Sequence, residues 1–183
     1  MAKVFLIYGP RGAGKTSTTI RLADELSRRG IDVGGYFQRT TTDDLDRRGY
    51  DLVRFRDHTQ TLPLARPGGV DKPGTSTVCS FSFSQEAFAA GIEWLKQDAP
   101  SSQVLVIDEL GKLEARGEGH AQALRWALGL GDDKVLLQSV RGDMLFYVVE
   151  NYGLEGRVAG YMEIPAAAEE LAAQAEQLAS MLG

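Results

Sequence analysis

The chain has 183 residues, of which 43% are hydrophobic and 25% charged, and this composition is typical of a soluble globular protein. Its formal net charge of −5 disfavours a general nucleic-acid surface, because binding the phosphate backbone requires clustered Lys and Arg. No apolar run approaches the ~18 residues that a membrane span needs, and the first predicted strand begins too early for a signal peptide. We therefore expect a single domain, residues 1–183, in the cytoplasm, with no nucleic-acid or membrane partner. The one cysteine, Cys79, cannot form an internal disulfide, and we expect it to serve in packing.

The first predicted strand, Val4 to Tyr8, leads into a phosphate-binding loop. Residues 9–16 read Gly-Pro-Arg-Gly-Ala-Gly-Lys-Thr and fit the pattern G-x-x-x-x-G-K-[ST]. Glycines let the backbone curl so that successive N–H groups point at phosphate oxygens. In this pattern Lys15 reaches the terminal phosphates and the Thr16 hydroxyl can bind Mg²⁺. The predicted nucleotide-binding residues are Gly9, Pro10, Arg11, Gly12, Ala13, Gly14, Lys15, Thr16 and Ser17.

A helix is predicted next, over Thr16 to Arg29, with Ile20, Ala23 and Leu26 on one stripe and Gly30 as its stop. Its positive N-terminal end adds to the anion site of the loop. A second strand is predicted over Ile31 to Phe37. The paired glycines 34 and 35 inside it indicate a bulge or a close approach by another backbone or a ligand.

Residues 38–83 differ from the rest, since they are polar and interrupted by glycine and proline. Short pieces at Tyr50 to Arg54 and Val78 to Phe83 could be strands, so we expect an antiparallel hairpin insertion here. After it, strands alternate with helices, which predicts an α/β fold whose mostly parallel sheet is covered on both faces. The predicted helices are Ser84 to Asp98, His120 to Leu128, Asp143 to Tyr152 and Pro165 to Leu182, and the strands are Val104 to Ile107, Val135 to Val140 and Val158 to Tyr161. Pro165 suits the first position of the last helix.

The buried strand Val104 to Ile107 ends in two acids, Asp108 and Glu109. Ligands of open α/β sheets bind at the carboxyl ends of the strands. We therefore predict that Asp108 and Thr16 hold Mg²⁺, Asp108 through a water, and that Glu109 orients or deprotonates a water for attack on the γ-phosphate. The alternative is that both acids cap the following segment.

A further positive charge usually stabilises the transition state of phosphoryl transfer. The candidates are Arg11, Arg47, Arg48 and Arg141. We favour Arg141, because it directly follows a predicted strand at the face where the nucleotide should lie. With Lys15 and Glu109 it completes the predicted catalytic set. His58 and His120 have no metal-ligand spacing and are expected to be surface or structural residues.

The chain resembles the small P-loop nucleoside-triphosphatases of the thermophile and cancer-related type. The resemblance rests on the loop 9–16, on Val-Gly-Gly-Tyr-Phe at 33–37, on Arg-Gly-Tyr at 48–50 and, most specifically, on Ile-Asp-Glu-Leu-Gly-Lys-Leu-Glu at 107–114. It implies a RecA-like P-loop fold and slow, Mg²⁺-dependent hydrolysis of ATP, GTP and other nucleoside triphosphates with little base preference.

Two other readings stay open. The same loop could serve a kinase that hands the phosphate to a small acceptor, although Glu109 beside Asp108 favours water as the nucleophile. Alternatively, the protein could be a nucleotide-gated accessory factor whose insertion at 38–83 grips a protein partner, so a protein partner is possible but unidentified. A specific guanine-nucleotide switch is disfavoured because the sequence Asn-Lys-x-Asp is absent.

Overall fold

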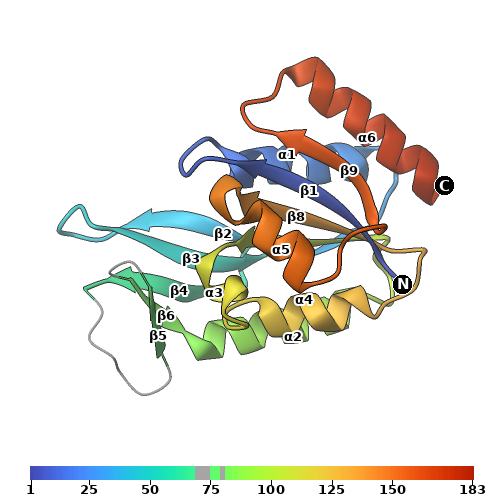
Figure 1. Cartoon of the computed structure of the whole chain (residues 1–183). Helices are drawn as coiled ribbons and strands as arrows, with labels where there is room; N and C mark the ends of the chain where they lie inside the picture. Colours follow the sequence, from blue (N-terminus) through green and yellow to red (C-terminus); the bar gives the residue numbers. More distant parts are fainter. Residues whose placement is uncertain (69–74, 79–80) are drawn as a thin grey trace.

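The structure, a computed structural model, describes residues 1–68, 75–78 and 81–183 (Figure 1). Cys79, expected to serve in packing, lies outside the described residues. The strands of the described part are β1 Lys3–Gly9, β2 Val33–Thr42, β3 Arg48–Arg54, β4 Thr61–Pro67, β5 Thr75–Val78, β6 Phe81–Ser84, β7 Val104–Leu110, β8 Val135–Arg141 and β9 Val158–Glu163. The helices are α1 Lys15–Arg28, α2 Gln85–Asp98, α3 Lys112–Ala115, α4 Ala121–Leu128, the 3₁₀ turn η1 Gly142–Met144, α5 Leu145–Asn151 and α6 Ala168–Leu182.

All described strands join one sheet in the order β5-β6-β4-β3-β2-β7-β8-β1-β9, and its half from β2 to β9 is parallel. Along β1, alternate residues serve two cores, because successive side chains of a strand point to opposite faces. Phe5 and Ile7 pack with α1 and α6, whereas Val4 and Leu6 pack in the cluster of α2 and α4. Figure 1 shows α1 and α6 on one face and α2 and α4 on the other. This is the predicted α/β fold, with helices on both faces of a mostly parallel sheet.

The antiparallel insertion begins within β2, which belongs to both parts of the sheet. Residues 33–36 of β2 pair in parallel with β7, and residues 36–42 pair antiparallel with β3. Further antiparallel pairs join β3 to β4, β4 to β6 and β5 to β6. The insertion is therefore an extension of the same sheet, as Figure 1 shows.

Three local expectations need correction. Pro165 is not the first residue of the last helix: it follows a cis peptide bond after Ile164, and α6 begins at Ala168. Ile20 lies at the edge of the buried face of α1 and is only half-buried, while Thr19 and Leu22 share that face with Ala23. The short helix α3 was not expected, because four residues are too few to show helical periodicity.

No helix among the described residues is long and apolar enough to cross a membrane.

Candidate active site

The loop between β1 and α1 has the conformation that the glycine spacing predicts. Gly12 and Gly14 have φ values of +78° and +93°, in the left-handed region that favours glycine. The side chain of Lys15 is buried, with a relative exposure of 3%, and its Nζ donates to the carbonyl oxygen of Pro10 at 2.9 Å. The lysine thus folds back across the loop, and it lines the pocket in front of it.

Asp108 lies fully buried beside the start of α1. Its Oδ2 accepts hydrogen bonds from Thr16 Oγ1 at 2.9 Å and from the backbone N–H of Gln38 at 3.0 Å, and its Oδ1 accepts one from Ser139 Oγ. Burial raises the pKa of Asp108, while these hydrogen bonds act in the opposite direction. The donors hold the carboxylate in one orientation next to the Thr16 hydroxyl.

The donor set of Thr16 and Asp108 fits Mg²⁺. Magnesium takes oxygen ligands and is usually bound by one or two carboxylates together with phosphates and water, not by a cage of protein side chains. Among the described residues no group of three or more His, Cys, Asp or Glu could hold a metal ion.

Glu109 follows Asp108 and reaches the loop lysine. Its Oε1 lies 3.6 Å from Lys15 Nζ, and its side chain retains 27% exposure. Burial raises the pKa of Glu109, and the negative charge of Asp108 adds to this effect, whereas Lys15 lowers it. A carboxylate with a raised pKa that is open to the pocket is suited to accept a proton from water.

The alternative, in which both acids cap the following segment, disagrees with the geometry. The backbone N–H of Gly111, at the N-cap of α3, donates to Glu114 Oε2 at 2.6 Å. Glu114 therefore makes the bond to the N-cap, and the side chain of Glu109 stays directed at Lys15.

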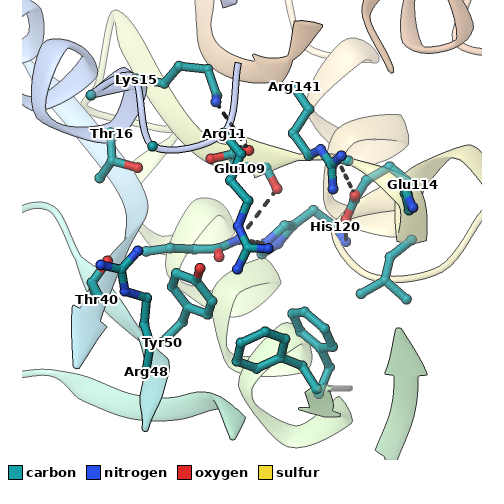
Figure 2. A pocket seen from close by; sticks show the side chains of 18 of the residues that line it. Arg11, Lys15, Thr16, Thr40, Arg48, Tyr50, Glu109, Glu114, His120 and Arg141 are labelled. Atoms are coloured by element: carbon teal, nitrogen blue, oxygen red, sulfur yellow. Dashed lines mark hydrogen bonds and ion pairs between the residues drawn. The ribbon is translucent and has the colours of Figure 1, made fainter. Parts of the chain in front are cut away.

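A pocket of about 420 Å³ lies in front of the loop (Figure 2). The predicted site residues that line it are Arg11, Gly12, Gly14, Lys15, Thr16, Ser17, Glu109 and Arg141. Gly9, Pro10, Ala13 and Asp108 are not among the residues that line it. The structure thus brings together most of the predicted set, whose roles remain predictions.

The four candidate arginines separate into two groups. Arg11, Arg48 and Arg141 line the pocket, whereas the exposed Arg47 is paired with Asp43 at 2.8 Å. Arg141, the favoured one, also forms two hydrogen bonds to Asp143, of 3.0 and 2.7 Å. Its guanidinium is therefore held at the pocket wall and shares its charge with a carboxylate.

Three residues of the site were not found from the sequence. Ser139 bonds Asp108, and a serine inside the apolar run of β8 was a signal that could have found it. Gln38 donates its backbone N–H to Asp108, and its Nε2 lies 3.1 Å from Nε2 of His120. Glu114 is buried, and burial raises its pKa to about 7.

His120 is a buried structural residue, in agreement with one of the two roles expected for it. Its Nδ1 lies 2.9 Å from the hydroxyl of Tyr36, and burial lowers its pKa to about 3, so the ring is neutral. His58, by contrast, is exposed.

Known proteins resemble this chain in sequence and in fold. The nucleoside-triphosphatase THEP1 of Methanocaldococcus jannaschii is 24% identical over 155 residues, which are 79% of this chain and 88% of that protein. The THEP1 of Thermofilum pendens is 28% identical over 166 residues, 88% of this chain and 82% of that protein.

Two solved structures share the fold. The crystal structure of THEP1 from Aquifex aeolicus superposes with a TM-score of 0.67 at 17% identity and covers 98% of both chains. The solution structure of a human cancer-related nucleoside triphosphatase gives a TM-score of 0.69 at 23% identity, covering 98% of this chain and 96% of that one. A family model described as NTPase matches residues 4–152. Because this match spans most of the chain, the protein belongs to that NTPase family.

Proposed function

We propose that this protein hydrolyses nucleoside triphosphates to diphosphates and phosphate, with Mg²⁺ and with little preference for the base. The observation that carries the proposal is the 3.6 Å contact between Lys15 Nζ and Glu109 Oε1 at the mouth of the phosphate loop. The contact supports the proposal because it joins Lys15, which would bind the γ-phosphate, to Glu109, which would take a proton from water. The names of the curated relatives, all nucleoside-triphosphatases, support the same reaction.

Each residue then has a defined role. The loop backbone and Lys15 bind the phosphates, and Glu109 accepts a proton as water attacks the γ-phosphorus and the bond to the β-phosphate breaks. Thr16 and Asp108 would hold Mg²⁺, which neutralises phosphate charge when bound. Arg141, at the pocket wall, would stabilise the charge of the transferring group.

The experiment is phosphate release from ATP, GTP, CTP and UTP with Mg²⁺, comparing wild type with Glu109→Gln. We expect hydrolysis of several triphosphates, slowed by ~10²-fold or more in the variant, because a positioned base contributes on that scale. The matched control is Glu93→Gln, whose exposed side chain pairs with Lys96 on α2, away from the pocket. If Glu109→Gln hydrolysed ATP as fast as the control, the water-activating role would lie elsewhere.

A second variant tests the loop itself. Lys15→Ala should abolish binding of the non-hydrolysable β,γ-imido-ATP, because Lys15 would bind the phosphates. The far-ultraviolet circular dichroism spectrum should stay the same, because Lys15 belongs to neither hydrophobic core cluster. Titration calorimetry measures the binding, and Lys96→Ala, at an exposed lysine, serves as the control. Wild-type affinity in Lys15→Ala would remove this loop from the mechanism.

A further inference from the structure

The pocket has a second wall, built of aromatic rings and facing the phosphate loop. Its members are Tyr50 of β3, Phe81 and Phe83 of β6, Phe88 of α2 and the neutral His120. Neighbouring rings are in contact along the whole series, with centroid separations of 5.5 Å for Tyr50 and Phe81, 6.4 Å for Phe81 and Phe83, 6.2 Å for Phe83 and Phe88 and 4.8 Å for Phe88 and His120. Tyr50, Phe81 and Phe83 are only half-buried, so these three rings present faces and edges to the pocket.

This aromatic wall lies on the far side of Glu109 from the loop. Across the sheet, the loop follows β1, Glu109 is on β7, and the wall comes from β3 and β6, beyond β2. Under the proposed function, on which this step rests, the γ-phosphate lies between Lys15 and Glu109. In the phosphate-loop pattern the loop backbone holds the α- and β-phosphates and Lys15 reaches the β- and γ-phosphates, so the base is attached at the end of the triphosphate farther from Glu109. We therefore expect the base of a nucleotide in the loop to lie away from the aromatic wall, which is on the other side of Glu109.

Two cations border the same space. Arg11 projects from the loop and Arg48 from β3, and neither forms an ion pair with any residue that the structure describes. Figure 2 shows Arg48 and Tyr50 on the side of the pocket opposite Lys15 and Thr16. Most other pocket charges are paired, such as Arg141 with Asp143 and Lys15 with Glu109. The free charges beside the rings match an anionic group on an aromatic ligand.

We propose that this half of the pocket binds a second small molecule while a triphosphate occupies the loop. The ligand has a planar aromatic ring joined to an anionic group, as a nucleoside monophosphate has. Its ring packs on Phe81 and Phe83, and its anionic group meets Arg48 and Arg11. Such a ligand lies directly beyond the γ-phosphate, next to Glu109, and is placed to change the turnover of the triphosphate.

The test is calorimetric titration of AMP, GMP, CMP and UMP, one at a time, into protein saturated with Mg²⁺ and β,γ-imido-ATP. Because the loop is filled, binding of a monophosphate reports on a second site. We expect at least one monophosphate to bind. Phe83→Ala should weaken its binding about tenfold more than that of the imido analogue, which is the scale of losing one stacking ring. The control is Phe146→Ala, which removes a ring that is 71% exposed on α5 and outside the pocket.

A second variant avoids any effect on packing. Arg48 is an exposed residue, so Arg48→Gln should fold normally and narrow the difference in affinity between AMP and adenosine, with Arg11 left as the remaining cation. The proposal is overturned if no monophosphate binds, or if Phe83→Ala and Phe146→Ala behave alike. It is also overturned if Phe83→Ala weakens the imido analogue instead, because the wall would then hold the base of the triphosphate. These readouts measure binding, so absence of hydrolysis would count against the proposed function alone.

Discussion

At the scale of single residues, Gly35 shows how closely the backbone is packed behind the site. It has φ of +95°, and a Cβ built on it would lie 2.2 Å from the carbonyl oxygen of Val106 in β7. Its N–H donates to Asp98 Oδ2 at 3.0 Å. The close approach that the paired glycines indicated is therefore one of strand to strand. It brings β2 against β7, and three residues later the N–H of Gln38 reaches Asp108.

We predict that Gly35→Ala lowers the free energy of unfolding by about 3 kcal/mol or more, since it adds a backbone clash to the left-handed strain. Gly30→Ala is the matched control: φ is +83°, but a Cβ there meets nothing within 4 Å. It should cost only about 1 to 2 kcal/mol, the strain alone. Urea unfolding measures both variants, and equal losses would show that the contact with Val106 carries no cost.

Which site residues the sequence reveals depends on how far apart they lie along the chain. The phosphate loop and the Asp108–Glu109 pair are local patterns, and they could be predicted. The contacts of Asp108 could not, because Gln38 and Ser139 lie 70 and 31 residues from it and meet it only through the strand order. The serine within β8 signals a polar group there but not its partner. Arg47 and Arg48 are neighbours in sequence, yet only Arg48, the first residue of β3, lines the pocket, whereas Arg47 pairs with Asp43 across the turn that precedes β3.

At the scale of elements, the segment from α3 to the start of α4 carries two buried groups with opposite pKa shifts. Burial raises the pKa of Glu114 from 4.5 to about 7 and lowers that of His120 from 6.5 to about 3. Glu114 Oε1 accepts the backbone N–H of His120 at 2.7 Å, so both belong to one turn. Glu114 binds its proton more tightly in the folded chain, and its contribution to stability falls as the pH rises from about 4.5 to about 7. His120 is protonated more easily in the unfolded chain, so its contribution falls as the pH drops below about 6.5.

When the pH falls from 7 to 5, protonation of Glu114 should raise the free energy of unfolding by about 2 kcal/mol, and protonation of His120 in the unfolded chain should lower it by about as much. In the wild type the two nearly cancel. Glu114→Gln leaves the His120 effect, so this variant should lose about 2 kcal/mol relative to wild type on acidification. His120→Gln leaves the Glu114 effect and should gain about as much. Urea unfolding of the wild type and the two variants at pH 5 and pH 7 measures these changes. The same pH dependence in all three proteins would contradict the pKa shifts of Glu114 and His120.

Most elements could be predicted from periodicity and stop signals. The helix expected over Ser84 to Asp98 begins one residue later, with Ser84 as its N-cap, because the serine oxygen accepts the N–H of Ala87.

The start of the last helix was predicted wrongly at Pro165, because a proline suits the first position of a helix but equally suits a turn. Here it lies in the connection from β9 to α6, next to Ile164, whose backbone packs against Gly9. That contact between the last strand and the phosphate loop leaves no local trace in the sequence.

At the scale of the whole molecule, one buried ion pair joins the parallel half of the sheet to the antiparallel insertion. Asp98, the last residue of α2, is 1% exposed, and its Oδ1 accepts from Arg54 Nη2, at the end of β3, at 2.5 Å. Its Oδ2 accepts the N–H of Gly35 in β2. A single carboxylate thus ties α2, β2 and β3 together. Of these elements, β3 and α2 carry Tyr50 and Phe88 of the aromatic wall, and β2 places Gln38 beside Asp108.

We predict that Asp98→Ala costs about 3 to 5 kcal/mol of unfolding free energy, because it leaves the Arg54 guanidinium buried without its carboxylate and the Gly35 N–H without an acceptor. Glu93→Ala, which breaks the exposed pair with Lys96 on the same helix, should cost at most ~1 kcal/mol. Adding Arg54→Met to Asp98→Ala should restore part of the loss, since the double variant no longer buries an unpaired charge. Urea unfolding compares all three variants. If the double variant were less stable than Asp98→Ala by the full cost of a second independent mutation, the two residues would not act as a pair, and another contact would have to hold the insertion against α2.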